Sequence, residues 1–414
     1  MSRLSLVLIV LGAFTIASGA LAGDNSGRIY GTIHTVDGDV FEGLIRWDKN
    51  EACWIDILDG TKDLPDRDDI GEESSRKRRK YGDRGSFSFF GVRIKGDVHY
   101  SSSAQSGIRF GHIERMEIVD DDRALLVLKS GEEVEFYNGS TDIGTGIREI
   151  VIEDSNEGEV EFSWEDIERI EFTAASDNVE TSFGERLYGT VMTRRGDEFT
   201  GFICWDIDEL FTNDILDGDD RRRSRKIKFG KISSIERYGS SGSQVTLTDG
   251  DELLLRNSND VDDGNRGIII SDPGFGQVEV EWDEFEKIEF KPAPDLIKYA
   301  DFDGGRKLRG TVYTEDDENY KGEILWDYDE AYTWEILNGE HRDNEYDIEL
   351  GMVKGIEKSS HRSSTITLVD GRSFRLRGSN DVDDDNKGIV IVTEEGDDVL
   401  VAWDDFERIE FETR

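Results

Sequence analysis

A nine-residue segment that begins with tryptophan and ends with Ile-Glu-Phe occurs three times in this chain. The copies begin at Trp164, Trp282 and Trp403, and their acidic, apolar and basic residues fall at the same offsets. Such agreement indicates one structural unit that is present three times. Two further segments recur ahead of each copy, in the same order: a Trp-Asp pair (Trp47-Asp48, Trp205-Asp206, Trp326-Asp327) and a segment similar to Asp-Ile-Leu-Asp-Gly (residues 56–60, 214–218, 335–339).

These recurrences set the predicted domain bounds. The first module is longer than the others because it contains an insertion at about residues 65–107. The linkers between modules are short, and the second contains Pro292 and Pro294, two of only four prolines. We therefore expect modules in a row with limited freedom. The predicted modules are residues 28–172, 187–290 and 307–411, and the linkers are residues 173–186 and 291–306.

Alternation of apolar and polar residues dominates inside each module, and helical periodicity is almost absent. Residues 245–255 and 366–376 each alternate around a central Asp-Gly, which is the signature of a β-hairpin. One apolar and one charged face per strand is typical of antiparallel sheets. We therefore predict an all-β fold of three tandem antiparallel modules. By analogy in strand count alone, each module resembles a small sandwich or a pair of SH3-like or Sm-like barrel halves.

Six of the eight tryptophans occupy two equivalent positions per module. Large rings at fixed places in every copy predict core residues. The alternative is a ligand-stacking platform, because carbohydrate and base sites also use tryptophan. The two cysteines, Cys53 and Cys204, fall at non-equivalent positions in different modules, so we expect buried thiols rather than a disulfide.

The first residues of the chain have the pattern of a secretory signal peptide. Arg3 precedes an apolar stretch that runs to about Ile16, and Ala20-Leu21-Ala22 satisfies the small-residue rule for cleavage. We predict a signal peptide at residues 1–22 and an exported protein, either periplasmic, on the cell surface or extracellular, with no transmembrane span after cleavage. The alternative is an uncleaved anchor, since a stretch of about 20 uncharged residues could just span a bilayer.

The charge balance of the chain restricts its partners. It carries 93 acidic and 50 basic side chains, a net charge of −43. This charge repels nucleic acid and anionic membranes, and it attracts cations or basic partners. The simpler interpretation is that the charge keeps an exported protein soluble. We expect no nucleic-acid partner, and we expect the partner to be a protein or another component of the cell envelope.

Two loops rich in aspartate and asparagine are the candidates for a metal site. Oxygen ligands at alternate positions of a tight loop can converge on Ca²⁺, which takes about 6–8 of them. An EF-hand is excluded because Ser271 and Val392 stand where its twelfth-position glutamate is required. The alternative is a polar connection whose residues serve turn geometry. The candidate ligands are Asp260, Asp262, Asp263 and Asn265 in one loop, and Asp381, Asp383 and Asp385 in the other.

Basic clusters follow the Asp-Ile-Leu-Asp-Gly-like segment in the first two modules, whereas the third module is acidic there. On so acidic a chain, such clusters could capture an anionic ligand or surface. The alternative is neutralisation of acidic neighbours within the same chain. The insertion adds aromatic residues beside basic ones and is a candidate for a module-specific contact. The candidate partner-binding residues are Arg76, Arg78, Arg79, Phe89, Phe90, Arg221, Arg222 and Arg223.

The sequence contains no established catalytic motif. Its five histidines fall at non-equivalent positions, and it lacks the His-Glu-x-x-His, Cys-x-x-Cys and Gly-x-Ser-x-Gly patterns. We therefore expect a non-catalytic β-repeat protein that serves as an interaction or envelope-associated scaffold. The first alternative is calcium-dependent adhesion or ligand binding through the aspartate-rich loops. The second is a hydrolase with a carboxylate pair in a cleft between modules, which requires at least one buried, desolvated carboxylate.

Overall fold

The computed structural model describes residues 25–63, 86–89, 92–95, 103–137, 141–176, 179–221 and 223–413. The predicted signal peptide lies outside these ranges, as does most of the predicted insertion. The prediction of an all-β fold is confirmed, since 55% of the chain is strand and 4% is helix, and the strands pair antiparallel. Among the described residues, no helix has the length and apolar character needed to cross a membrane.

The first sheet has ten strands in the order β11-β10-β2-β1-β12-β7-β8-β9-β3-β6. Every strand in it comes from residues 30–172, and the first and last strands of this range pair with each other through β1 and β12. The bounds are β1 Tyr30–Thr35, β2 Val40–Trp47, β3 Ile57–Asp63, β6 Ser103–Arg109, β7 Ile113–Asp120, β8 Arg123–Leu128, β9 Glu133–Tyr137, β10 Ile150–Asp154, β11 Gly158–Phe162 and β12 Ile167–Phe172.

The second and third sheets repeat the part of this order that runs from β11 to β9. The second is β19-β18-β17-β22-β13-β14-β20-β21-β26-β25, and the third is β29-β28-β27-β32-β23-β24-β30-β31. The bounds in the second are β13 Tyr188–Thr193, β14 Glu198–Trp205, β17 Ile232–Arg237, β18 Ser243–Leu247, β19 Glu252–Leu255, β20 Ile268–Asp272, β21 Gly276–Val280 and β22 Phe285–Phe290. Those in the third are β23 Arg309–Thr314, β24 Asn319–Leu325, β27 Val353–Ser360, β28 Ser363–Leu368, β29 Ser373–Leu376, β30 Ile389–Thr393, β31 Asp398–Val401 and β32 Phe406–Phe411.

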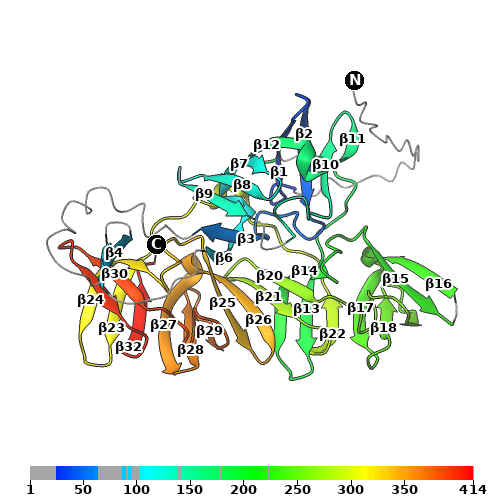
Figure 1. The fold of residues 1–414 in the computed structure, drawn as a ribbon. Helices are drawn as coiled ribbons and strands as arrows, with labels where there is room; N and C mark the ends of the chain where they lie inside the picture. The colour runs from blue at the N-terminus through cyan, green and yellow to red at the C-terminus, as the bar shows by residue number, and fades with distance from the viewer. Residues whose placement is uncertain are drawn as a thin grey trace.

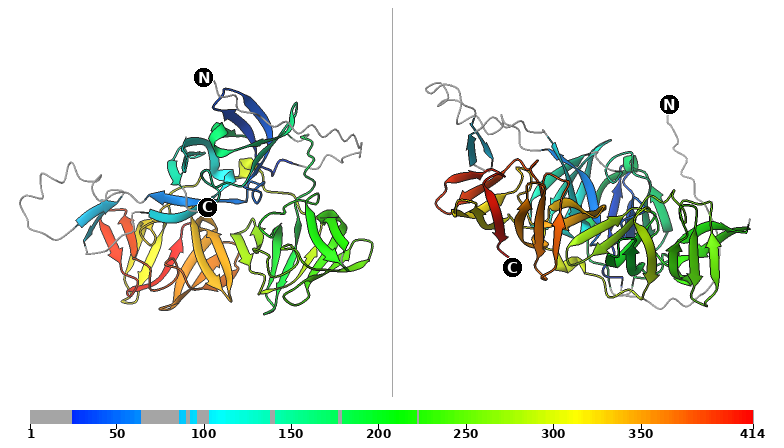
Figure 2. Two further views of the ribbon diagram at one scale, coloured as in Figure 1. Left: turned by 45° about the vertical axis from the view of Figure 1, so that its right-hand side comes forward. Right: turned by 90° about the horizontal axis from the view of Figure 1, so that it is seen from below.

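A pair of antiparallel strands begins within each Asp-Ile-Leu-Asp-Gly-like segment, and the three pairs, called hairpins below, are used differently. The pair β15–β16 (Ile215–Asp220 and Arg223–Lys228) forms a small separate sheet, whereas β3–β6 belongs to the first sheet through β9. The pair β25–β26 (Ile336–His341 and Asn344–Glu349) leaves its own range and extends the second sheet by pairing with β21. In Figures 1 and 2 it lies between the second and third sheets, which form a row beside the first sheet.

The strand β26 approaches β21 very closely at one residue. Gly276 has a φ of +151°, and a Cβ at this position would lie 1.9 Å from the Asp347 carbonyl oxygen. Only glycine fits here, because any side chain would separate the two strands. The pairing between β21 and β26 therefore depends on this residue.

The tryptophans repeated in the sequence lie in the cores, which confirms their prediction as core residues. Trp47, Trp205 and Trp326 are fully buried, and each indole Nε1 donates to a backbone carbonyl, at 2.9 to 3.1 Å. Each also packs edge-on against the second repeated tryptophan, with ring centroids 6.2 to 6.3 Å apart. Cys53 and Cys204 are buried free thiols, as expected.

Both predicted Asp-Gly hairpins are present. The strands β18 and β19 turn at Asp249-Gly250, and β28 and β29 turn at Asp370-Gly371. Both glycines have a φ of +91°, a conformation that few other residues adopt. The alternating pattern therefore predicted these two turns for the correct physical reason.

The segment between the second and third sheets is held against the first sheet. Tyr299 donates its hydroxyl to the Ile113 carbonyl at 2.8 Å and packs on Trp54, with ring centroids 4.4 Å apart. Phe302 lies edge-on to His112, with centroids 5.1 Å apart. The limited freedom expected of this linker thus has a specific cause, which is burial of its aromatic residues in the first core.

Candidate functional site

A short acidic loop follows each buried tryptophan at the end of β2, β14 and the strand β24. We name these the Trp-Asp loops, residues 47–51, 205–209 and 326–330. In each loop, the tryptophan forms an antiparallel β-bridge with a glutamate four residues later. The aspartate that follows the tryptophan has a φ of 40° to 52°. The glutamates are Glu51, Glu209 and Glu330. The sequence contained this signal, because a glutamate stands four residues after the tryptophan in all three copies, but sequence reasoning stopped at the Trp-Asp pair.

A second aspartate approaches each loop from a distant segment. These residues are Asp142, Asp260 and Asp381, and their backbone carbonyls are the ones that accept the tryptophan N–H. One oxygen of each carboxylate accepts a hydrogen bond from a hairpin backbone N–H, at 2.5 to 2.8 Å. Each aspartate therefore joins the core tryptophan, the hairpin and the acidic loop. Two of them, Asp260 and Asp381, were predicted calcium ligands.

A basic residue is the third component of each cluster. Arg148, Arg266 and Lys387 occupy equivalent places, and the backbone N–H of each donates to the aspartate of the Trp-Asp loop. Their side chains also reach that aspartate. The three clusters thus share one arrangement of two aspartates, a glutamate and a basic residue. They differ in how far the basic residues offset the acidic ones.

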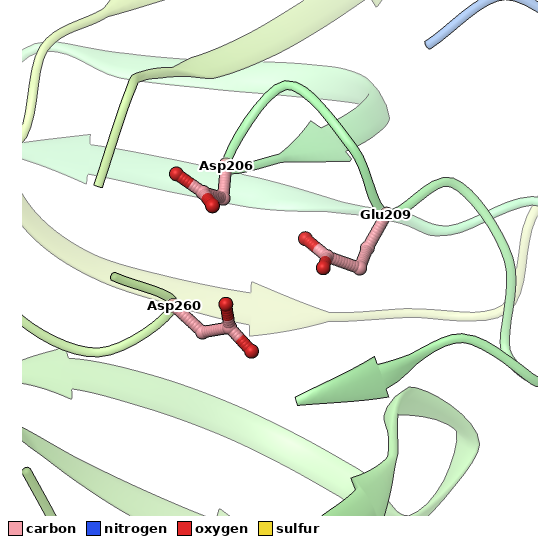
Figure 3. Close-up of side chains that lie close together, drawn as sticks. All are labelled: Asp206, Glu209 and Asp260. Carbon is pink, nitrogen blue, oxygen red and sulfur yellow. The ribbon is translucent and has the colours of Figure 1, made fainter. Parts of the chain in front are cut away.

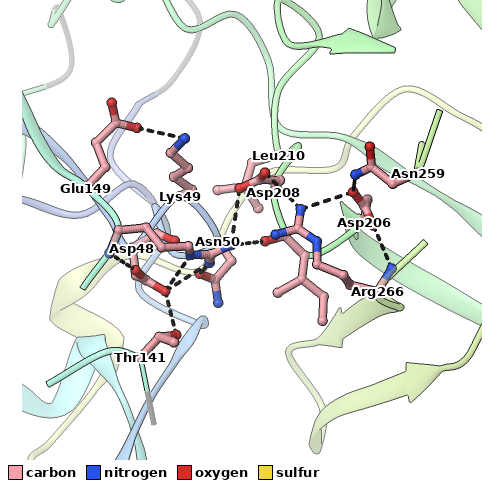
Figure 4. A network of polar contacts seen from close by, with 12 residues as sticks. Asp48, Lys49, Asn50, Thr141, Glu149, Asp206, Asp208, Leu210, Asn259 and Arg266 are labelled. Carbon is pink, nitrogen blue, oxygen red and sulfur yellow. Dashed lines mark hydrogen bonds and ion pairs between the residues drawn. The ribbon is translucent and has the colours of Figure 1, made fainter. Parts of the chain in front are cut away.

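In the first cluster a guanidinium group occupies the loop. Arg148 donates to the Asp48 carboxylate and to the Asn50 side-chain oxygen. Thr141 also donates to Asp48, at 2.7 Å (Figure 4). Asn50 stands where the other loops have aspartate, which lowers the negative charge. Arg148 also reaches Asp208, so this guanidinium ties the first loop to the second.

In the second cluster the carboxylates of Asp206, Glu209 and Asp260 point toward one another (Figure 3). Burial, followed by the charges of its acidic neighbours, raises the pKa of Glu209 to about 10. Burial also raises the pKa of Asp260, to about 6. Arg266 bridges Asp206 and Asp208 at 3.0 and 2.8 Å, and Figure 4 shows this bridge beside the first loop. Arginine therefore neutralises the second loop from two sides.

In the third cluster the compensation is weaker. One oxygen from each of Asp327, Asp329 and Asp381 lies within 4.8 Å of the others. Lys387 is the basic residue, 3.2 Å from Asp327 and 3.5 Å from Asp329. Burial and acidic neighbours raise the pKa of Asp327 to about 7, and they raise the pKa of Glu330 well above its ordinary value.

This third cluster opens into a cavity of about 590 Å³. The cavity lies where residues 103–105 of β6 meet β25, β26 and the third Trp-Asp loop. Six acidic side chains and one lysine line it: Asp329, Glu330, Glu340, Glu345, Asp347, Asp381 and Lys387. The condition set for the hydrolase alternative, a buried carboxylate in a cleft, is therefore met here, although nothing in the arrangement assigns a reaction.

The other predicted calcium ligands serve the turns of their own loops in this structure. Asp262 accepts from the Gly264 N–H, and Asn265 accepts from the Gly267 N–H, both at 3.1 Å. Asp383 accepts from the N–H groups of Asp385 and Gly378, and the side chains of Asp263 and Asp385 are exposed. This arrangement is the turn geometry weighed as the alternative. Calcium binding by these residues stays a prediction.

The predicted partner-binding residues are only partly visible. Arg76, Arg78, Arg79, Phe90 and Arg222 lie outside the described residues, and of Phe89 only its place at the end of β4 (Ser86–Phe89) is described. That strand pairs with β5 (Val92–Lys95), which contacts the edge strand β31. Arg221 and Arg223 are exposed at the β15–β16 turn, and Arg221 lies 3.9 Å from Asp220.

Comparison of the chain with models of protein families, with curated proteins and with solved structures finds no match.

Proposed function

We propose that this protein is an exported, non-catalytic scaffold built from three tandem β modules, and that it recruits a partner by strand addition at β11. The strands β11, β21 and β31 occupy equivalent places in the three sheets. The strand β21 is covered by β26, and β31 is contacted by β5. Among the described residues, β11 pairs on one side only, with β10. This difference carries the proposal.

An edge strand presents unpaired backbone N–H and C=O groups that pair readily with an extended segment of another protein. The side chains on β11 favour a basic partner, because Glu159 and Glu161 are exposed. Position 161 corresponds to Glu279 of β21, which faces Glu345 of β26. The same place in the sheet is thus open in one case and covered in the other.

A photo-reactive amino acid placed at either position tests the proposal. The two variants, at Glu161 and at Glu279, are incubated with an extract of the native cell envelope and irradiated, and the adducts are identified by mass spectrometry. We expect a defined protein adduct at position 161 and none at position 279. Equal labelling at both positions, or no adduct at 161, contradicts strand addition.

The hydrolase alternative retains one specific observation, the buried carboxylates of the cavity described above. Two carboxyl groups with different pKa values are the minimal machinery of glycoside hydrolysis. Assay against a panel of chromogenic glycosides and esters, with Glu330→Gln as the control, tests it. Turnover that persists in the Glu330→Gln variant comes from elsewhere and removes this candidate.

A further inference from the structure

We propose that the cavity between the first and third sheets binds one divalent cation, calcium by preference, through Asp327, Asp329, Glu330 and Asp381. These ligands differ from the aspartate-rich loops considered in the sequence, with which they share only Asp381. The cation would hold the third Trp-Asp loop against the distant segment that carries Asp381.

Negative charge exceeds positive charge inside the cluster. Asp327, Asp329 and Asp381 converge here with Glu330 beside them, and Lys387 contacts Asp327 and Asp329 directly. The ammonium of Lys62 is already committed, because it pairs with Glu335 and donates to the Asp329 backbone carbonyl at 2.5 Å. Buried carboxylates in such excess require protons or a metal ion.

Second, two residues that line the cavity each have a buried carboxylate oxygen without a hydrogen-bond donor. Asp329 is 6% exposed and Glu330 is 5% exposed, and both line the cavity. Neither Asp329 Oδ1 nor Glu330 Oε2 has a donor among the described residues. A buried acceptor without a partner costs about 1–3 kcal/mol. An ion coordinated by these oxygens removes that cost.

Third, the spacing of the oxygens and the types of group in the site suit Ca²⁺. Ligand oxygens within 4.8 Å of one another match opposite positions around Ca²⁺, whose bonds to oxygen are about 2.3–2.6 Å long. The other lining groups, which include Asn338, Ser379 and Asn380, also offer oxygen. A cavity of about 590 Å³ leaves space for the water molecules that complete a coordination shell.

The other two clusters show why the third is the one that binds. Arg148 donates to Asp48 and Asn50 in the first, and Arg266 bridges Asp206 and Asp208 in the second. A guanidinium group makes several directed hydrogen bonds and does not leave easily. Lysine is a point charge on a flexible chain, and Lys387 can move aside when an ion enters.

Terbium luminescence provides a direct test, because Tb³⁺ occupies calcium sites and is sensitised by a nearby indole. Trp326 donates to the Asp381 carbonyl and is the sensitiser. In about 150 mM KCl, which screens the exposed acidic surface, we expect one saturable Tb³⁺ site whose emission is displaced by Ca²⁺. Calorimetry with Ca²⁺ alone measures the stoichiometry independently.

Matched variants locate the site. Asp329→Asn and Glu330→Gln are expected to weaken binding by about tenfold or more, as loss of a coordinating or supporting group does. Lys387→Arg, which makes the third cluster resemble the second, is expected to do the same without removing a carboxylate. Asp208→Asn changes the equivalent residue of the second loop and is expected to leave binding unchanged. Circular dichroism verifies the fold of each variant.

The overturning results are equally specific. Absence of a Ca²⁺-displaceable Tb³⁺ signal from the folded wild-type protein refutes the site, and so does a signal that Asp208→Asn weakens as much as Asp329→Asn does. Unchanged binding in folded Lys387→Arg refutes the argument from the lysine. These measurements do not involve β11, so the cation site can fail while strand addition holds, and the reverse.

Discussion

Replacement of Arg109 tests how the three sheets are held together. This residue ends β6, its side chain is 2% exposed, and its Nε lies 3.3 Å from a Glu349 oxygen at the end of β26. Its two terminal nitrogens donate to the backbone carbonyls of Asp272 and Pro273, at 3.1 and 3.2 Å. One guanidinium group of the first sheet therefore contacts the second sheet and the hairpin that extends it.

The expected loss in free energy of unfolding depends on the buried carboxylate that Arg109→Met would leave without its main partner. Glu349 has a side chain that is 5% exposed, and its remaining basic neighbour would be the His112 imidazole, at 3.5 Å. Burial alone would raise the pKa of Glu349, but Arg109 and His112 outweigh burial and lower it. Removal of one partner from such a buried pair costs about 3–5 kcal/mol. We expect Arg109→Met to reduce the free energy of unfolding by that amount.

Urea denaturation, followed by tryptophan fluorescence and by circular dichroism, measures the change, and agreement of the two probes tests for a single transition. Lys228 ends the equivalent strand β16, where its ammonium donates to Asn213 at 3.1 Å at the surface. Lys228→Met is therefore the control and should change stability by no more than about 0.5 kcal/mol. The double variant Arg109→Met/Glu349→Leu should recover at least half of the loss, because no buried charge remains.

The pH dependence gives a second check on the same pair. A carboxyl group whose pKa is lowered by folding stabilises the protein above its unfolded pKa of about 4.3, and this stability is lost as the pH falls through the folded pKa. The difference between wild type and Arg109→Met should therefore be full at pH 7 and shrink below about pH 4. A loss below about 1 kcal/mol at pH 7, or strict additivity in the double variant, refutes the reasoning.

Three further predictions concern other parts of the molecule. Because folding raises the pKa of Asp260 to about 6, the contribution of Asp260 to stability should fall as the pH rises from about 4 to 6, and Asp260→Asn should be more stable than wild type at pH 8 but not at pH 4, by urea denaturation. Calcium affinity at the proposed site should increase from pH 6 to 8, since the raised pKa values of Asp327 and Glu330 require proton release, which calorimetry in two buffers detects. Tyr299→Phe removes the donor to the Ile113 carbonyl, should cost about 1–2 kcal/mol, and should speed proteolysis of residues 291–298.

The sequence pattern predicted the features that depend on residues close together in the chain, which are the turns and the core positions. Alternation and the Asp-Gly pairs identified the hairpins at Gly250 and Gly371, because turn geometry is decided within a few residues. The repeated tryptophans were identified as core residues, because a large ring at a fixed place in each copy has few other roles. These features need no knowledge of which strands meet across the molecule.

Pairing between distant strands was not predictable in the same way. The strand β26 resembles its counterparts β6 and β16 in pattern, yet it alone extends another sheet. What distinguishes β26 is the close approach of its Asp347 to Gly276. The chain has 44 glycines, and nothing in the sequence shows which of them makes such a contact. The last residues of the three hairpins, Arg109, Lys228 and Glu349, occupy equivalent positions, and two are basic while one is acidic. This difference in charge indicates a contact only when it is known that Arg109 and Glu349 meet.

The acidic composition explains why the three clusters differ in their chemistry. A chain with 93 acidic and 50 basic residues cannot give every buried carboxylate a basic partner. Where arginine is available, as in the first two Trp-Asp loops, its guanidinium group is hydrogen-bonded to the aspartate of the loop and offsets its charge. Where Lys387 is the direct partner, the remaining negative charge must be balanced by protons or by a metal ion, and a rise in pH favours the metal ion. The same repeated loop can therefore be a structural junction twice and a cation site once, with the choice made by a single basic residue.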